Sequence, residues 1–73
     1  MTAFSERVKM LRKERGLKQR EAADVCGLGL RGYQQYEYGE SYPDVPKLLI
    51  LADFYNVSLD YLMGRTDKRE VNR

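Results

Sequence analysis

The sequence predicts an all-α fold of five short helices in one domain. Apolar residues recur every three or four positions in five separate stretches, which is the spacing of a helix face. Glycines and capping residues stand between these stretches, and no stretch shows the strict alternation of a half-buried strand. A chain of 73 residues has room for one hydrophobic core and no second domain.

The first helix is predicted over residues 4–15, where the apolar spacing is helical and Gly16 follows as a terminator. Thr2 is the better of the candidate caps at its start. The second helix is predicted over 19–26 and the third over 30–38.

The fourth helix is predicted to start after Asp44, a good N-cap, because Pro46 fits the first turn of a helix. It continues to about Tyr55. Ser58 is then predicted to cap a final helix over 59–63.

The apolar faces of these helices are expected to form one core. Its predicted members are Phe4, Val8, Leu11, Leu17, Ala22, Ala23, Cys26, Leu28, Tyr33, Tyr36, Leu48, Leu49, Leu51, Ala52, Tyr55, Val57, Leu59 and Leu62. Residues 1–66 form the predicted domain, and the polar segment 67–73 is expected to be a frayed tail.

The composition argues against several classes of function. The chain has no histidine and one cysteine, so we expect no disulfide, no bound metal and no cofactor. Cys26 falls on an inward helix face, and burial is a simpler interpretation than a redox sensor. No group of side chains has a recognisable catalytic spacing, so we do not expect an enzyme. No apolar run approaches a membrane span and no signal peptide opens the chain, which favours the cytoplasm.

Charge is distributed unevenly along the chain. Residues 1–31 carry eight basic and four acidic side chains, whereas residues 32–64 carry one basic and five acidic side chains. The last nine residues carry four basic and two acidic ones, and the net charge of the whole chain is +2. Such polarity suits a protein that meets a polyanion with one side, although a solvated helix face would look the same.

The second and third predicted helices are too short, and too closely connected, to pack as an antiparallel hairpin. Only three residues join them, beginning with Gly27, which suits a left-handed helix terminator. The helices must therefore cross steeply, and Ala23 is small where they would meet. This is the helix-turn-helix geometry, which presents its second helix to the major groove of DNA.

An ordered set of residues from Phe4 to Arg65 resembles the Cro and phage-repressor type of helix-turn-helix domain, the XRE-family transcriptional regulators. The matching residues are Val8, Leu11-Arg12, Gly16-Leu17, Gln19, Ala23, Gly27-Leu28, Tyr36-Glu37, Gly39, Pro43, Leu48-Leu49, Ala52, Val57 to Leu62 and Gly64. The resemblance implies a five-helix, lambda-repressor-like fold and a regulator, most simply a repressor, that binds double-stranded DNA as a homodimer.

The helix at about 30–38 is the predicted reading element. If Tyr33 and Tyr36 face the core, the opposite face is free to contact bases, or is merely an ordinary exposed helix face. Arginine can pair with guanine, glutamine with adenine, and leucine can press on a thymine methyl. The predicted base-contacting residues are Leu30, Arg31, Gln34 and Gln35.

The resemblance assigns a phosphate contact to Gln19 at the start of the second helix, where plain solvation is the alternative. The other predicted phosphate contacts are Arg12, Lys18, Arg20 and Tyr38. Family members also pair residues equivalent to Arg12 and Glu37, and the alternative is two unpaired surface charges.

Some residues depart from the family pattern. Gly29 and Lys18 stand where a Ser or Thr cap is usual, and Gly32 lies inside the reading helix. Glycine there costs roughly 1 kcal/mol relative to alanine, but it could let the helix approach DNA more closely.

The C-terminal part of the domain is the predicted dimer surface. Its residues are Val57, Leu59, Tyr61 and Met63, which would otherwise simply close the core. An alternative function of another class is a protein-interaction module of the same fold, resembling an antirepressor or antitoxin. It would use the surface tyrosines Tyr38, Tyr42 and Tyr61 and the acidic middle segment.

Overall fold

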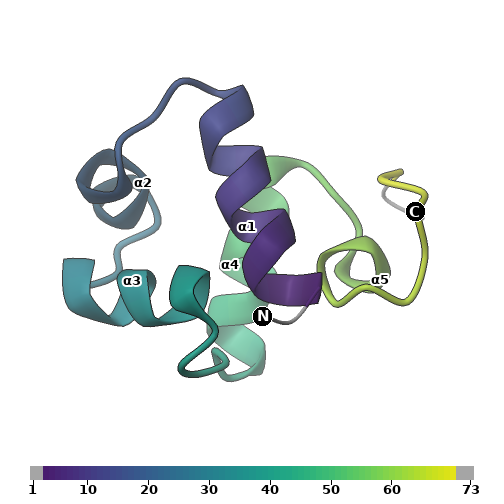
Figure 1. The fold of residues 1–73 in the computed structure, drawn as a ribbon. Coiled ribbons are helices and arrows are strands. Elements are labelled where there is room, and N and C mark those ends of the chain that lie inside the picture. Colours follow the sequence, from purple (N-terminus) through teal and green to yellow (C-terminus); the bar gives the residue numbers. More distant parts are fainter. Residues whose placement is uncertain (1–2, 71–73) are drawn as a thin grey trace.

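The computed structural model describes residues 3–70, and this part of the chain contains five α-helices and no strand (Figure 1). The helices are α1 (Ala3–Glu14), α2 (Gln19–Val25), α3 (Leu30–Tyr38), α4 (Val45–Tyr55) and α5 (Leu59–Leu62). The all-α prediction is confirmed, and each helix boundary falls within one residue of its expected place. Thr2, the expected cap of α1, lies outside the described residues.

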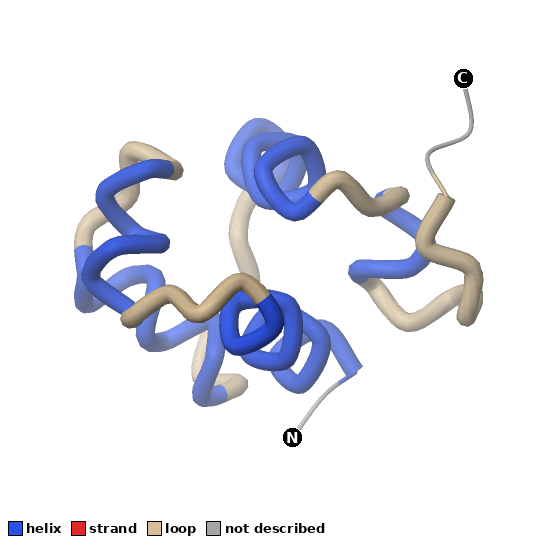
Figure 2. Tube along the Cα trace, turned by 90° about the horizontal axis from the view of Figure 1, so that it is seen from above, coloured by secondary structure: helices blue, strands red, loops and turns tan. Residues whose placement is uncertain are grey.

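Helix α1 lies across the middle of the molecule and packs against α3 and α5. The pair α2 and α3 lies at one end, and α5 lies at the other (Figure 1). The view from above shows the same separation (Figure 2). The two ends of the domain are therefore built by different helices, with α1 connecting them.

The hydrophobic core collects buried side chains from all five helices. Phe4 and Val8 of α1, Tyr33 of α3, and Leu51 of α4 are at most 1% exposed. Isolated helices of this length are marginal in water, so their stability comes from this shared burial. In the described part of the chain, no helix is both long enough and apolar enough to cross a membrane.

The core differs most from the prediction at three positions, and Leu17, Leu28 and Leu48 are only partly buried against it. Leu49 and Leu59 were expected inside but are 44% and 36% exposed, whereas Tyr61 was expected outside and is 5% exposed. Helix α4 is apolar on almost every side, and α5 has only four residues, so periodicity could not identify their buried faces. Tyr61 is buried because the guanidinium groups of Arg7 and Arg69 lie over its ring, 4.2 and 5.3 Å from the centroid.

The helix boundaries follow the capping chemistry read from the sequence. The Asp44 carboxylate accepts a hydrogen bond from the Lys47 amide, and the Ser58 hydroxyl accepts one from the Tyr61 amide. Gly64 ends the last helical turn at a φ of +82°, where a Cβ would lie 2.5 Å from the Cβ of Ala3. Only glycine fits this contact between the start of α1 and the end of α5.

Residues 67–70, which were expected to belong to a frayed tail, make specific contacts with the rest of the domain. The backbone of Ser58 donates to the Arg69 carbonyl at 2.9 Å. The Arg69 guanidinium forms two hydrogen bonds with the Glu14 carboxylate, at 2.7 and 2.8 Å, and Arg7 pairs with Asp67 at 2.9 Å. Charged residues in a polar tail thus find partners on α1, which the local sequence did not reveal. Residues 71–73 lie outside the described part of the chain.

Candidate nucleic-acid interface

The connection between α2 and α3 fixes how the second helix is presented. Gly27 adopts a left-handed φ of +70°, and the Leu28 amide donates to the Ala23 carbonyl at 2.8 Å, so the chain turns sharply after α2. Ala23 is fully buried. The two helices pack against each other, as a helix-turn-helix requires.

Helix α3 is held with its aromatic side toward the core. Tyr33 is fully buried and Tyr36 is 8% exposed, and the hydroxyl groups of Tyr33 and Tyr55 lie 2.5 Å apart. Burial and this hydrogen bond raise the pKa of Tyr33, and burial raises the pKa of Tyr55 to about 12. The tyrosines therefore anchor α3 as neutral groups.

The four residues expected to contact bases all lie on α3, but Leu30 stands one turn before the buried Tyr33, at the border of the inward side. Arg31 is exposed, and the other three are half-buried: Leu30, Gln34 and Gln35. All four belong to one two-turn helix, so the structure does place them close together. Gly29 stands at the N-cap of α3 without a side-chain hydrogen bond, and a Cβ at Gly32 would meet nothing within 4 Å.

Arg12 and Glu37 form the expected ion pair between α1 and α3. The Arg12 Nε donates to Glu37 Oε2 at 2.7 Å and its Nη2 donates to Oε1 at 3.2 Å, while Nη1 donates to the Leu17 carbonyl at 2.7 Å. The Glu37 side chain is fully buried and that of Arg12 is 11% exposed. The hydrogen bond with Glu37 raises the pKa of Arg12. Arg12 is thus committed mainly to structure, and little of it is left for a phosphate.

Gln19 joins this ion pair to the outer side of α3. Its Nε2 donates to Glu37 Oε1 at 3.1 Å, and its Oε1 accepts from Gln34 Nε2 at 3.0 Å. The Tyr38 hydroxyl also donates to Gln19 Oε1, at 3.5 Å. Each of these residues was predicted from the sequence to belong to the site. Their contacts with one another were not predicted, because nothing in their spacing indicates which side chains meet across two helices.

The remaining candidates for phosphate contact lie around the start of α2. Lys18 and Arg20 are exposed, and Tyr38 is 52% exposed. Lys18 occupies the N-cap without using its own side chain; instead, its amide donates to the Glu21 carboxylate at 2.8 Å. The basic side chain is left free to reach outward.

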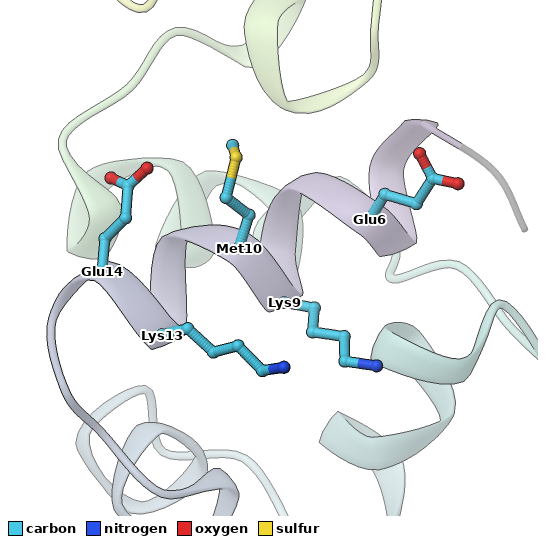
Figure 3. Close-up of a pocket in the computed structure, with 5 residues that line it drawn as sticks. All are labelled: Glu6, Lys9, Met10, Lys13 and Glu14. Carbon is cyan, nitrogen blue, oxygen red and sulfur yellow. The ribbon is translucent and has the colours of Figure 1, made fainter.

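The outer face of α1 carries a hollow of about 500 Å³, lined by Glu6, Lys9, Met10, Lys13 and Glu14. Figure 3 shows Lys9 and Lys13 pointing to one side of the helix, whereas Glu6, Met10 and Glu14 point to the other. One helix supplies the whole lining, so this is an open helix face.

The predicted dimer surface needs a correction. Val57 and Tyr61 are 4% and 5% exposed, so both belong to the core of the domain. Leu59 and Met63 are 36% and 37% exposed. The burial of Tyr61 also removes it from the tyrosines that a protein-interaction module could use.

The comparisons with known proteins agree with this geometry. A family model described as "Helix-turn-helix" matches residues 8–62. The chain is 36% identical over 70 residues to the HTH-type transcriptional regulator ImmR of Bacillus subtilis (strain 168), covering 96% of this chain and 55% of that protein. It is 37% identical over 69 residues to the cryptic phage CTXphi transcriptional repressor RstR of Vibrio cholerae, covering 92% of this chain and 62% of that protein.

A crystal structure of a transcriptional regulator from Listeria innocua is similar as well. It shares 38% sequence identity with a TM-score of 0.77, and the match covers 84% of this chain and 57% of that one. The chain therefore belongs to the XRE-type helix-turn-helix family. It spans less than two-thirds of the length of each of these relatives.

Proposed function

We propose that this chain is a sequence-specific DNA-binding module of a transcriptional regulator, most simply a repressor, that reads the major groove with α3. The observation that carries the proposal is the outward side of α3. Arg31, Gln34 and Gln35 stand there on a helix that buried aromatic residues fix from behind. These are side chains that can hydrogen-bond to base edges. Such a regulator needs no catalytic chemistry, and its place of action is the cytoplasm.

Phosphate contacts around α2 would set the register of α3 in the groove. Lys18 and Arg20 are exposed, and Gln19 keeps one amide hydrogen beyond the one donated to Glu37. Each phosphate neutralised by a lysine or arginine releases counterions, so binding should weaken steeply as salt rises.

A mobility-shift titration against DNA fragments at two salt concentrations tests the proposal. We expect saturable retention of particular fragments, with lower affinity at the higher salt concentration. Arg31→Ala should weaken specific binding by about tenfold or more, since a bidentate arginine–guanine contact is worth about 1–3 kcal/mol. Arg65→Ala is the matched control, because Arg65 is 80% exposed and pairs only loosely with Asp60.

Two results would contradict the proposal. One is the absence of saturable, salt-sensitive binding to any fragment. The other is equal loss of affinity in the Arg31 and Arg65 variants, which would indicate that α3 reads no base.

We further propose that the DNA-bound form is a homodimer, because one short helix reads too few bases for high specificity. The surface favoured for pairing is a groove of about 370 Å³ lined by Leu49, Leu59 and neighbouring residues at the junction of α4 and α5. Met63 lies one turn beyond Leu59 and is also exposed. Of the dimer residues predicted from the sequence, this surface keeps the two exposed ones, Leu59 and Met63, and it adds Leu49.

Sedimentation with and without a two-fold symmetric DNA site tests the dimer. Leu59→Glu should leave a folded monomer that binds such a site at least tenfold more weakly. Met10→Glu, on the exposed face of α1, is the control for adding a carboxylate to an exposed apolar position. A wild-type protein that saturates a symmetric site as one copy would contradict this part of the proposal.

A further inference from the structure

The buried Glu37 carboxylate fixes the orientation of two glutamine side chains in series. It lies at the centre of the domain's polar network, accepting from Arg12 and from Gln19. An ionised carboxylate has only acceptor oxygens, so whatever faces it must donate. The amide of Gln19 must therefore present its nitrogen to Glu37, because the opposite orientation would set two oxygens against each other.

The orientation of Gln19 determines that of the next side chain. With its nitrogen inward, Gln19 presents its oxygen toward α3, where Gln34 and Tyr38 both donate to it. Gln34 must then direct its own nitrogen toward Gln19, at 3.0 Å. Its carbonyl oxygen has no hydrogen-bond partner in residues 3–70, and the side chain is only half-buried.

A free glutamine in the major groove can rotate its amide and offer either a donor or an acceptor. Gln34 has lost that freedom, because rotation would break its bond to Gln19 and oppose two oxygens. Among the base edges in the major groove, adenine N6 and cytosine N4 are donors, whereas guanine O6 and thymine O4 are acceptors. A carbonyl oxygen fixed toward the base therefore matches the first pair of bases and opposes the oxygens of the second. The second Nε2 hydrogen of Gln34 remains available, and beside an adenine N6 it can donate to N7 of the same base.

We propose that Gln34 is a specificity-determining residue that recognises an exocyclic amine, of adenine or cytosine, through a carbonyl oxygen whose direction is set from the core by Glu37 and Gln19. The inference rests on the proposed function. It assigns to Gln19 the role of a positioning residue at the base contact, in addition to any phosphate contact.

The first experiment selects bound sequences from random DNA with the wild-type protein and with Gln34→Met, which keeps the length of the side chain but removes both polar atoms. We expect one base position at which adenine or cytosine is preferred by about five- to tenfold, and at which the variant shows no preference. Gln35→Met is the matched comparison and should alter a different position. Circular dichroism shows whether each variant is folded.

The second experiment removes the amine from the DNA. In the preferred site, the selected adenine is replaced by purine, or the selected cytosine by 2-pyrimidinone, each of which lacks the exocyclic amine. The wild-type protein should lose about five- to tenfold in affinity, and Gln34→Met should lose nothing further. The analogue that produces the effect shows which of the two bases supplies the amine.

The third experiment tests the role of Gln19 in setting the direction. Gln19→Met frees the Gln34 amide to rotate, so the preference for adenine or cytosine over guanine or thymine should disappear at that one position. Loss of a phosphate contact alone would instead weaken binding to every sequence by the same factor.

The outcomes separate this inference from the proposed function. If the wild-type protein binds no DNA specifically, the proposed function fails. If it binds specifically but no base position depends on Gln34, or the dependent position prefers guanine or thymine, the inference alone is overturned. Equal sensitivity of the wild-type and Gln34→Met proteins to the amine-lacking analogue would overturn it as well.

Discussion

At the scale of single residues, the chain places one carboxylate in its interior and surrounds it with donors. Glu37 is fully buried and accepts hydrogen bonds from Arg12 and Gln19. A charge in this environment is tolerated only because its partners replace the water it has lost. The arrangement ties α1 and α2 to α3, so this carboxylate supports both the fold and the side of α3 that we propose contacts DNA.

Removing Arg12 should therefore be costly. We expect Arg12→Met to lower the free energy of unfolding by about 3–5 kcal/mol, because it leaves the Glu37 carboxylate buried without its cation. Urea unfolding measures this. The double variant Arg12→Met with Glu37→Met should recover much of the loss, since no isolated charge remains. An Arg12→Met variant within 1 kcal/mol of the wild type, by the same measurement, would contradict the role given to the ion pair.

The buried tyrosine pair gives stability an alkaline limit. The pKa values of Tyr33 and Tyr55 lie above the ordinary value near 10, and that of Tyr55 is raised to about 12. Above about pH 10 the unfolded chain releases these protons while the folded chain retains them, so stability is complete below that pH and falls as pH rises further.

We expect this decline to reach up to about 1 kcal/mol per pH unit for each tyrosine. Urea unfolding between pH 8 and pH 11.5 measures it. The double variant Tyr33→Phe with Tyr55→Phe should show a shallower decline, because the two groups no longer titrate in the unfolded state. The same slope in both proteins would mean that this pair does not cause the alkaline loss.

At the scale of helices, the sequence predicts well where each helix begins and ends. It predicts less well which side of each helix is buried. Capping residues such as Asp44 and terminators such as Gly27 are local chemistry, so they could be read directly. The inward side of α3 was also predictable, because its two tyrosines repeat at helical spacing. The exposure of Leu49 and Leu59 was not predictable. Helix α4 is apolar on almost every side and α5 is a single turn, so neither shows a periodic pattern that identifies its buried face.

Gly32 provides a prediction that belongs to α3 as a whole. Alanine at this position would meet nothing within 4 Å, so Gly32→Ala should raise the free energy of unfolding by up to about 1 kcal/mol. If the glycine serves close approach to DNA, the same variant should bind its site more weakly. Thermal unfolding and a binding titration on one preparation measure the two effects. A variant that is stabler and binds equally well would show that Gly32 has no such role.

The candidate site shows the same division between local and long-range information. The resemblance to the family predicted roles for Gln19 and Glu37. It also predicted that Glu37 pairs with Arg12. The bond between Gln19 and Gln34 did not follow, because it depends on how α2 crosses α3. Residue types thus predict which hydrogen-bonding groups the site contains. The way in which α2 crosses α3 determines which of their polar atoms remain without a partner.

At the scale of the whole molecule, the segment 67–70 closes the domain across α1 and α5. Arg69 connects Glu14 with the Tyr61 hydroxyl, which accepts from Arg69 Nε at 3.2 Å. Arg7 donates to the carbonyl groups of Tyr61 and Thr66 from the other side. The domain is therefore held at this end by charged side chains around one buried ring.

We expect Arg69→Ala to lower the melting temperature, whereas Arg65→Ala, which removes an exposed and loosely paired arginine, should leave it nearly unchanged. The hydrogen bond from Arg69 lowers the pKa of Glu14. The contribution of this pair is present above the ordinary carboxyl range and is lost as pH falls through the lowered pKa. The difference in melting temperature between wild type and Arg69→Ala should thus be larger at pH 7 than at pH 3. Equal melting temperatures of the two arginine variants at pH 7 would contradict this role.

The docking of residues 67–70 on α1 and α5 also determines where a label or a fusion partner can be attached. This segment lies at the end of the molecule away from α3 (Figure 1). A fluorophore or a fusion partner joined behind it starts its path far from α3, the helix proposed to read the groove. Such attachments should leave DNA recognition intact, which makes this end the natural place for a reporter.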